Sequence, residues 1–600
     1  MNAMNSKGWK NLRNLIIGIT ATSTSIKKSK MTTSSSTRPE PPATPTASTT
    51  KKEAVSAATT TSATTATENL SPSTCSLEEY ERTREKLLAQ DRGLAFDTQA
   101  IARATKVERS ADQVVKRIRQ HERAHLGVSP SNGGGSSEHF LGNLENINRS
   151  QLMEISKMMP KGAHLHCHFN TCLHPSFLIR QARGMKSMFI RSSVALVRPE
   201  DFACAAISFA VLSPDTPRSD VFDRGYSPLG WAPYPDFLER FPTQMLGGEG
   251  PESWLANKMI IREQEAHDIH QTTDGIWNRF NQSTQMLKGL FGYESAFRRY
   301  VGEAIQSFLD DNVMYAEVRP NFFDKFIMTD NGLGKLDHFA WMTIIREEIA
   351  SKMKQLAENG RKEDFRGFKV IYCAPRSIEK KDMKWCLDDC MALKREFPDL
   401  ICGFDMVGCE DRGNPIRHYL NELLEFRRTC DAAGLDIPFL FHAGETLRHG
   451  ESTDENLFDA ILLGSKRIGH GYGLARHPEL MKICRERGIA LELCPISNEI
   501  LHLCPSIQGH SLPILLTNGV PCTISSDNPA YFSSTLSHDF YQVMSGFDSM
   551  SLHGWRVLAE WSLEHSCMNA WEKSCALAEW NRKWEAFCQW IVEEFGSNKR

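Results

Sequence analysis

The sequence predicts an α/β protein built as a (β/α)8 TIM barrel, with a long insertion after the first strand and an N-terminal helical extension. From about residue 150, eight short apolar runs with β-strand character alternate with longer helical patterns. Histidines and carboxylates lie at the carboxyl ends of several runs, where a barrel builds its active site. The connection 169–312, between the first two runs, is much longer than the others.

The eight strand-like runs are 162–168, 313–319, 367–373, 400–408, 437–445, 467–471, 489–495 and 520–527. Helical patterns such as 421–434 and 477–488 separate most of them, which favours a parallel sheet. An open doubly wound sheet is the alternative, but no glycine-rich phosphate fingerprint follows the first run. We expect 151–590 to form the barrel, with extra helices or an inserted subdomain in 169–312.

The N-terminal part of the chain differs in composition from the rest. Residues 31–67 are mostly Ser, Thr, Ala and Pro, which cannot bury enough apolar surface to offset their ordering entropy, so 1–70 is predicted to be disordered. The segment 71–150 is predicted to be a helical extension and linker, with a flexible loop at 131–137. Its helices either pack against a partner, giving a homodimer, or wrap the outer face of the barrel.

Charge and cysteine usage exclude several classes of protein. The formal net charge of −3 indicates no general preference for nucleic acid. The sequence has no apolar run of about 18 residues, so no membrane-spanning helix is expected. The 17 cysteines include no CxxC pair and favour a reduced, cytoplasmic protein. The first 39 residues carry seven Lys or Arg and no acid, so a secretory signal or a mitochondrial presequence remains an alternative.

The first candidate site element is His166-Cys167-His168, at the end of the first run. Residues i and i+2 of a strand point to the same side, so both imidazoles face one point while Cys167 faces away. Two convergent imidazoles suit zinc. His164 has the same parity but lies one step deeper, and we expect a structural role for it.

Three further run ends supply what a mononuclear hydrolytic site needs. His442 offers a third metal ligand, and Glu445 just beyond it can act as a general acid if burial raises its pKa. His470, between two glycines, can take a proton from an activated water. Asp527 can complete a His3Asp zinc site and accept a hydrogen bond from that water.

The motifs MPKGAHLHCH, FHAGET, RIGHGYGL and SSDNPAYF, taken in order, resemble those of the adenosine/AMP deaminase superfamily. The stretch from IWNRFNQ to MYAEVR is most similar to the adenosine deaminase-related growth factor branch, and the resemblance spans roughly 150–550. It implies a zinc-dependent hydrolase that converts adenosine, 2′-deoxyadenosine or both to inosine and ammonia, in purine nucleoside catabolism or salvage.

The resemblance also implies the role of each site residue. One Zn²⁺ per chain would be held by His166, His168, His442 and Asp527. Glu445 would protonate N1 of the purine, and His470 would orient and deprotonate the attacking water. The backbone N–H of Gly408 would contact the purine, and Trp277 would lie near the substrate.

Two positions depart from the family pattern. Asn170 stands where the family has an Asp that meets the ribose 5′-hydroxyl, and Asn528 stands where it has an Asp that hydrogen-bonds purine N7. An amide can serve both contacts. These changes leave open a preference for a modified adenosine or another aminopurine nucleoside, or a weakly active growth-factor-like protein that binds nucleosides.

Other zinc hydrolases fit the sequence less well. No cluster of Lys or Arg for a 5′-phosphate is evident at the run ends, and the HxE…PCxxC pattern of cytidine-type deaminases is absent from the sequence. A two-metal amidohydrolase needs a bridging Lys or Glu at the fourth run, which ends at Val407-Gly408 instead. Whether Cys172 and Cys204 pair in a disulfide is left open.

Overall fold

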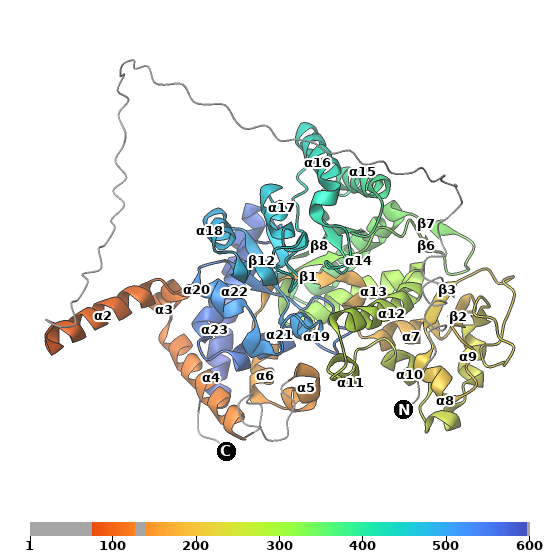
Figure 1. Cartoon of the computed structure of the whole chain (residues 1–600), viewed down its shortest axis with the longest axis horizontal. Helices are drawn as coiled ribbons and strands as arrows, with labels where there is room; N and C mark the ends of the chain where they lie inside the picture. Colours follow the sequence, from red (N-terminus) through yellow and green to blue (C-terminus); the bar gives the residue numbers. More distant parts are fainter. Residues whose placement is uncertain (1–74, 126–138, 597–600) are drawn as a thin grey trace, which may run out of the picture. The chain divides into compact units, whose positions relative to one another are not determined.

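The computed structural model describes residues 75–125 and 139–596, and this part of the chain is shown in Figure 1. The predicted disordered segment 1–70, the loop 131–137 and the basic N-terminal segment that bears on localisation lie outside the described residues. Within the described ranges, no helix combines the length and the apolar character that a membrane span requires.

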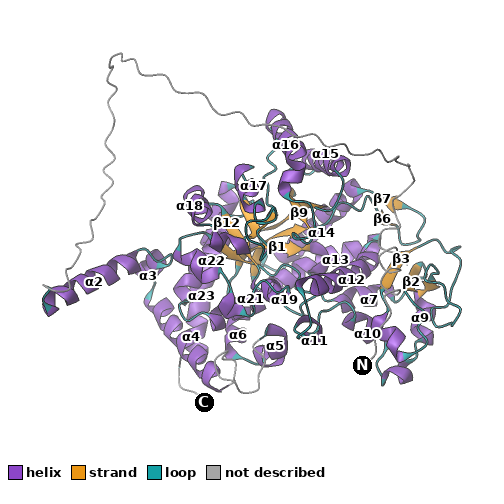
Figure 2. Cartoon of the chain, in the orientation of Figure 1, coloured by secondary structure: helices purple, strands orange, loops and turns teal. Residues whose placement is uncertain are grey.

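Two four-stranded parallel sheets form the centre of the fold (Figure 2). The first has the order β1 (Gly162–His168), β5 (Val313–Arg319), β8 (Gly367–Pro375) and β9 (Ile401–Val407). The second has the order β10 (His442–Ala443), β11 (Arg467–His470), β12 (Ala490–Leu493) and β13 (Cys522–Ile524). Each of the eight predicted runs therefore overlaps one of these strands, and the predicted α/β class with parallel sheets is confirmed.

Backbone contacts link the edges of the two sheets. In β1, Cys167 forms a parallel bridge with Asp527, and the N–H of Asp527 donates to the carbonyl of His166 over 3.1 Å. At the opposite edge, Phe404 of β9 bridges to Phe439, which precedes β10. The strand ends that carry His166 and Asp527 are thus joined directly, although they lie far apart in the sequence.

Helices with one apolar face cover the sheets, as their periodicity predicts. In α13 (Glu294–Asp310), Phe297, Val301 and Ile305 follow one another at four-residue spacing and are all buried. The other helices around the strands are α14 (His338–Glu358), α15 (Lys380–Glu396), α16 (Leu420–Ala433), α17 (Asn456–Leu462), α18 (Pro478–Arg487), α19 (Pro495–Ile500), α20 (Leu512–Thr517), α21 (Leu536–Gly546), α22 (Leu552–Glu564) and α23 (Ala570–Phe595).

The segment 169–312 contains helices and a small antiparallel sheet of order β3-β2-β4 (Figure 1). Its elements before α13 are α7 (Pro175–Ala182), β2 (Met188–Ser192), α8 (Pro199–Cys204), β3 (Ile207–Val211), β4 (Ala232–Pro233), α9 (Tyr234–Arg240), α10 (Pro251–Asn257), α11 (Glu263–Ala266) and α12 (Thr273–Phe291). A Cβ atom at Gly289 of α12 would lie 2.0 Å from the Phe209 carbonyl oxygen of β3, so only glycine permits this close packing.

Cys172 and Cys204 are both free thiols in this structure. The sulfur of Cys172 lies 3.5 Å from that of Cys167 in β1, whereas Cys204 is exposed at the end of α8. The neighbour of Cys172 is therefore a cysteine of the central strand.

The N-terminal extension comprises α2 (Leu77–Gly93), α3 (Thr98–Arg103), α4 (Lys106–His125), α5 (Phe140–Asn148) and α6 (Gln151–Met158). Helix α4 packs along α23 and α22. Its buried Arg119 donates through Nη1 to the carbonyl oxygens of Met544, Phe547 and Met550 over 2.8–3.1 Å, whereas α2 has no buried residue. Most of the extension thus covers the outer helices, and the predicted homodimer stays a prediction.

Candidate metal and active site

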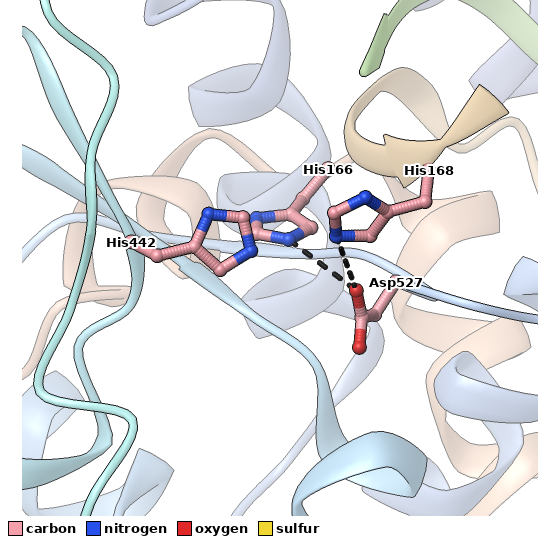
Figure 3. Close-up of side chains that lie close together, drawn as sticks. All are labelled: His166, His168, His442 and Asp527. Atoms are coloured by element: carbon pink, nitrogen blue, oxygen red, sulfur yellow. Dashed lines mark ion pairs between the residues drawn. The ribbon is translucent and has the colours of Figure 1, made fainter. Parts of the chain in front are cut away.

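Four predicted ligands converge at the carboxyl ends of β1 and the second sheet. The ligand atoms of His166, His168, His442 and Asp527 all lie within 4.8 Å of one another. Figure 3 shows the two β1 imidazoles directed at one carboxylate oxygen, Asp527 Oδ1, at 3.5 Å from His166 Nε2 and 3.2 Å from His168 Nε2. The alternation of side chains along β1 brings these two imidazoles to one point, as predicted.

The environment of these atoms fits a divalent metal ion. His166 Nε2 and Asp527 Oδ1 are buried and have no hydrogen-bond partner among the described residues. A buried polar atom without a hydrogen-bond partner costs about 1–3 kcal/mol. Such atoms are therefore rare unless a ligand or an ion satisfies them. Three imidazole nitrogens and one carboxylate oxygen are a donor set that suits zinc.

Strained backbone places two of the site residues. Asp527 and His470 have φ angles of 56° and 58°, in the left-handed region that non-glycine residues seldom adopt. Next to His470 in the chain, Gly469 leaves room for His166: a Cβ atom there would lie 2.9 Å from His166 Cε1. Gly469 of the RIGHG motif therefore allows its strand to approach the His166 imidazole closely.

A buried ion-pair network beneath the cluster orients two of the histidines, and sequence reasoning missed it. His166 Nδ1 lies 2.8 Å from Glu492 Oε2, and His442 Nδ1 lies 2.7 Å from Asp405 Oδ2. Arg319 joins the two carboxylates, donating to Asp405 over 2.9 Å and to Glu492 over 2.6 Å. Such carboxylate–histidine pairs fix the ring orientation and direct the other nitrogen of each imidazole towards a metal.

The charges of this network hold its carboxylates ionised. Burial alone raises the pKa of Glu492, but Arg319 and Arg467 more than reverse that effect and hold it well below its ordinary value. Burial likewise raises the pKa of Asp405, and contacts with His442 and Arg319 reverse it. The sequence signal was a charged residue inside a buried apolar strand, which is rare unless it is paired.

Glu445 and His470 face each other beside the four predicted ligands. His470 Nε2 lies 3.6 Å from Glu445 Oε1, and both side chains are buried. Burial first, and then the negative charges of Asp527 and Glu410, raise the pKa of Glu445 well above its ordinary value. Burial lowers the pKa of His470 well below 6.5, against the opposing influence of Asp527. The arrangement therefore offers a protonated carboxyl group beside a neutral imidazole.

The loop that carries Glu445 is held by Glu410, a second residue that sequence reasoning missed. The N–H groups of Gly444 and Glu445 donate to its two carboxylate oxygens over 3.1 and 2.6 Å. Asn456 of α17 donates to Glu410 over 2.7 Å, and Arg376 donates to the His442 carbonyl oxygen over 2.9 Å. Glu410 thus positions the turn between His442 and Glu445.

Helix α19 supports the other side of the site. Ser497 donates to Asp527 Oδ2 over 2.7 Å. Asn498 Nδ2 lies 3.0 Å from His470 Nδ1, and Asn498 Oδ1 lies 3.0 Å from His510 Nε2. Ser497 and Asn498 of α19 therefore supply hydrogen-bonding partners of Asp527 and His470.

Two asparagines with an expected role in substrate binding lie close to the predicted metal ligands in the chain. Asn528 directly follows Asp527, and the Thr171 hydroxyl lies 3.3 Å from its Oδ1. Asn170, two residues after His168, donates to the Tyr531 hydroxyl over 3.3 Å. Both amides are thus held by neighbouring hydroxyl groups.

Trp277 and Gly408 belong to elements that contact each other. Gly408 follows β9 with φ 107°, a conformation that requires glycine. Arg412, four residues further on, donates to Asn278 of α12 over 2.8 Å. Trp277, the neighbour of Asn278, is buried, with its ring 5.1 Å from that of Phe280. Helix α12 therefore docks on the loop that begins at Gly408.

Comparison with known proteins agrees with the motifs. Residues 260–581 match the model of the adenosine deaminase family. The chain is 30% identical over 483 residues to adenosine deaminase 2-A of Danio rerio, covering 80% of this chain and 88% of the relative. It is 32% identical over 464 residues to an adenosine deaminase of Phlebotomus duboscqi (76% and 82% covered) and 30% identical over 458 residues to adenosine deaminase 2 of Homo sapiens (75% and 83% covered). The chain therefore belongs to the adenosine deaminase family of aminohydrolases.

Proposed function

We propose that this protein hydrolyses adenosine, 2′-deoxyadenosine or both to inosine and ammonia with one zinc ion per chain. The observation that carries the proposal is the buried cluster of three histidines and Asp527, with Glu445 and His470 beside it. The site needs a metal for its unpaired atoms and already holds a proton donor and a proton acceptor. We further infer that the two sheets form one closed (β/α)8 barrel, which the backbone bridges at both pairs of edges support.

His166, His168, His442 and Asp527 would hold the zinc ion, which would supply Lewis-acid activation of the attacking water near neutral pH. The neutral imidazole of His470 accepts the proton of the attacking water. Glu445, kept protonated by its buried position, donates to N1 of the purine as C6 is attacked. The 6-amino group takes the proton held by His470 and leaves as ammonia. The hydroxyl group on C6 returns its proton to Glu445, which leaves the 6-oxo purine.

The remaining predicted residues would hold the nucleoside. The Asn528 side-chain NH2 group donates to purine N7, and the Gly408 N–H contacts the purine ring. Asn170 meets the ribose 5′-hydroxyl, and Trp277 lies near the bound substrate. The two amides are neutral where the wider family has carboxyl groups, so donation to N7 does not require a protonated side chain.

The proposed function is tested by a panel assay on the full-length, zinc-loaded protein. We offer adenosine, 2′-deoxyadenosine, N6-methyladenosine, AMP and guanosine, and follow ammonia release before and after treatment with a chelator. We expect turnover of an unmodified adenine nucleoside that the chelator abolishes and added zinc restores. Turnover only of a modified or phosphorylated substrate would overturn the proposed specificity, and binding without turnover would favour a nucleoside-binding role.

The proposed contact of Asn528 predicts a substrate-dependent effect. Asn528→Ala is expected to lower kcat/KM for adenosine about tenfold or more, because N7 loses its donor in a dry site. With 7-deazaadenosine, which lacks N7, the same substitution is expected to change kcat/KM little. Steady-state kinetics on both substrates measure this difference. Equal losses on the two nucleosides would show that Asn528 does not contact N7.

A further inference from the structure

A second group of potential metal ligands lies outside the site described above. It consists of His139, which precedes α5, His267, which follows α11, and Glu499 of α19. Their ligand atoms all lie within 4.8 Å of one another. We call these residues the His139 cluster; its three elements are labelled in the lower central part of Figure 1. The three segments lie far apart in the sequence, so only the tertiary fold brings them together.

Glu499 is a buried carboxyl group with few polar neighbours. Its residue is 3% exposed, and its Oε1 accepts a hydrogen bond from the Phe140 N–H over 2.6 Å. Burial raises the pKa of Glu499 to about 8, with only the Phe140 N–H opposing the effect. A carboxyl group in such a place is expensive to ionise unless a cation lies beside it. A bound metal ion would supply that cation.

The two imidazoles offer nitrogen donors. The rings of His139 and His267 stack with their centroids 3.7 Å apart and an interplanar angle of 6°, so one ring would turn to bring both lone pairs onto one ion. His267 Nε2 is buried and has no hydrogen-bond partner in the described part of the chain. Burial and the neighbouring His139 and His502 lower the pKa of His267 to about 4, so it is neutral at physiological pH. Neutral imidazole is the form that binds metal ions.

We propose that His139, His267 and Glu499 bind a second zinc ion. Two imidazoles and one carboxylate are a common zinc ligand set, and they leave a fourth position for water. Both histidines are partly exposed, which gives the ion a route from solvent. His502 takes a supporting role, since its Nε2 lies 2.7 Å from the Ala266 carbonyl oxygen and so fixes the residue before His267.

A zinc ion bound here is expected to hold helix α19 in place. The ion joins the start of α5 and the end of α11 to Glu499, which directly follows Asn498. Asn498 and Ser497 are the partners of His470 and Asp527 in the catalytic site. The second zinc would therefore stabilise the segment that positions the catalytic residues without touching the substrate.

A second pair of histidines, His449 and His477, also lies beside a carboxylate, but that carboxylate is already neutralised by an arginine. Asp454 lies between His449 and His477, but Arg476 Nη2 is 3.0 Å from its Oδ1. The guanidinium already neutralises that carboxylate, and His449 is largely exposed. In the described part of the chain, no Arg or Lys influences the pKa of Glu499.

Metal content tests the proposal. Full-length wild type, Glu499→Gln and the double variant His139→Ala/His267→Ala are stripped with a chelator, reloaded with zinc, separated from free metal and analysed for zinc and protein. We expect wild type to hold one zinc ion more per chain than either variant. Glu499→Gln keeps the size of the side chain and an oxygen for the Phe140 N–H, so it guards against a failure to fold.

The matched control is His270→Ala, which removes an exposed histidine three residues from His267 and should leave the zinc content unchanged. Replacement of zinc by Co²⁺ should give visible absorption bands that lose intensity in Glu499→Gln. Equal zinc contents in wild type and Glu499→Gln would overturn the proposal. Because the readout is a difference of one ion, it is independent of whether the first site deaminates adenosine.

Discussion

Replacement of Glu445 by Gln is expected to lower kcat about 10²- to 10⁴-fold, the contribution of a well-placed general acid. The amide keeps the size of the side chain but holds no transferable proton, so N1 of the purine is no longer protonated as C6 is attacked. Steady-state ammonia release from the zinc-loaded variant measures the loss. Its zinc content should equal that of wild type, because Glu445 is not among the proposed ligands.

The control for this variant is Glu451→Gln, on the same loop but with a side chain that is 59% exposed, which should keep wild-type activity. The pH profile supplies a second readout. Because Glu445 acts only when protonated and its pKa is raised, kcat/KM should fall as the pH rises through that pKa. A Glu445→Gln variant with near-wild-type kcat would remove Glu445 from the mechanism.

Replacement of Asp405 by Asn is expected to weaken zinc binding about 10- to 100-fold, the usual effect of losing a carboxylate behind a ligand histidine. The carboxylate holds His442 through Nδ1 and pairs with Arg319, and all three side chains are buried. Its loss leaves Arg319 with one carboxylate fewer, so we also expect a destabilisation of about 3–5 kcal/mol. Competition with a zinc-binding dye and denaturant unfolding measure the two effects.

Asp389→Asn is the matched control for Asp405→Asn. Asp389 also pairs with a histidine, His338, over 2.6 Å, and accepts from the Tyr372 hydroxyl over 2.9 Å. His338 belongs to α14 and is not among the proposed metal ligands. This variant should therefore lose stability but retain the zinc affinity of wild type. Equal zinc affinities of Asp405→Asn and wild type would show that Asp405 does not orient the ligand.

The sequence by itself determined the eight strands and the residue types at their carboxyl ends. Apolar runs bounded by helical patterns predict strands because local burial and periodicity are properties of short segments. The HxH spacing likewise places His166 and His168 on one side of a strand without any tertiary information. The predicted metal ligands all belong to such strand ends, and the structure brings them within 4.8 Å of one another.

Only the tertiary structure decided which charged residues stand behind those ligands. Arg319, Asp405 and Glu492 lie on three different strands, and their pairing depends on how the two sheets meet. The same holds for Glu410 beneath Glu445 and for the His139 cluster, which joins α5, α11 and α19. The type and spacing of residues predict the structure of a short segment. The partner of a buried charge comes from a segment far away in the sequence, and it offsets the free-energy cost of removing that charge from water, so only the packed fold reveals it.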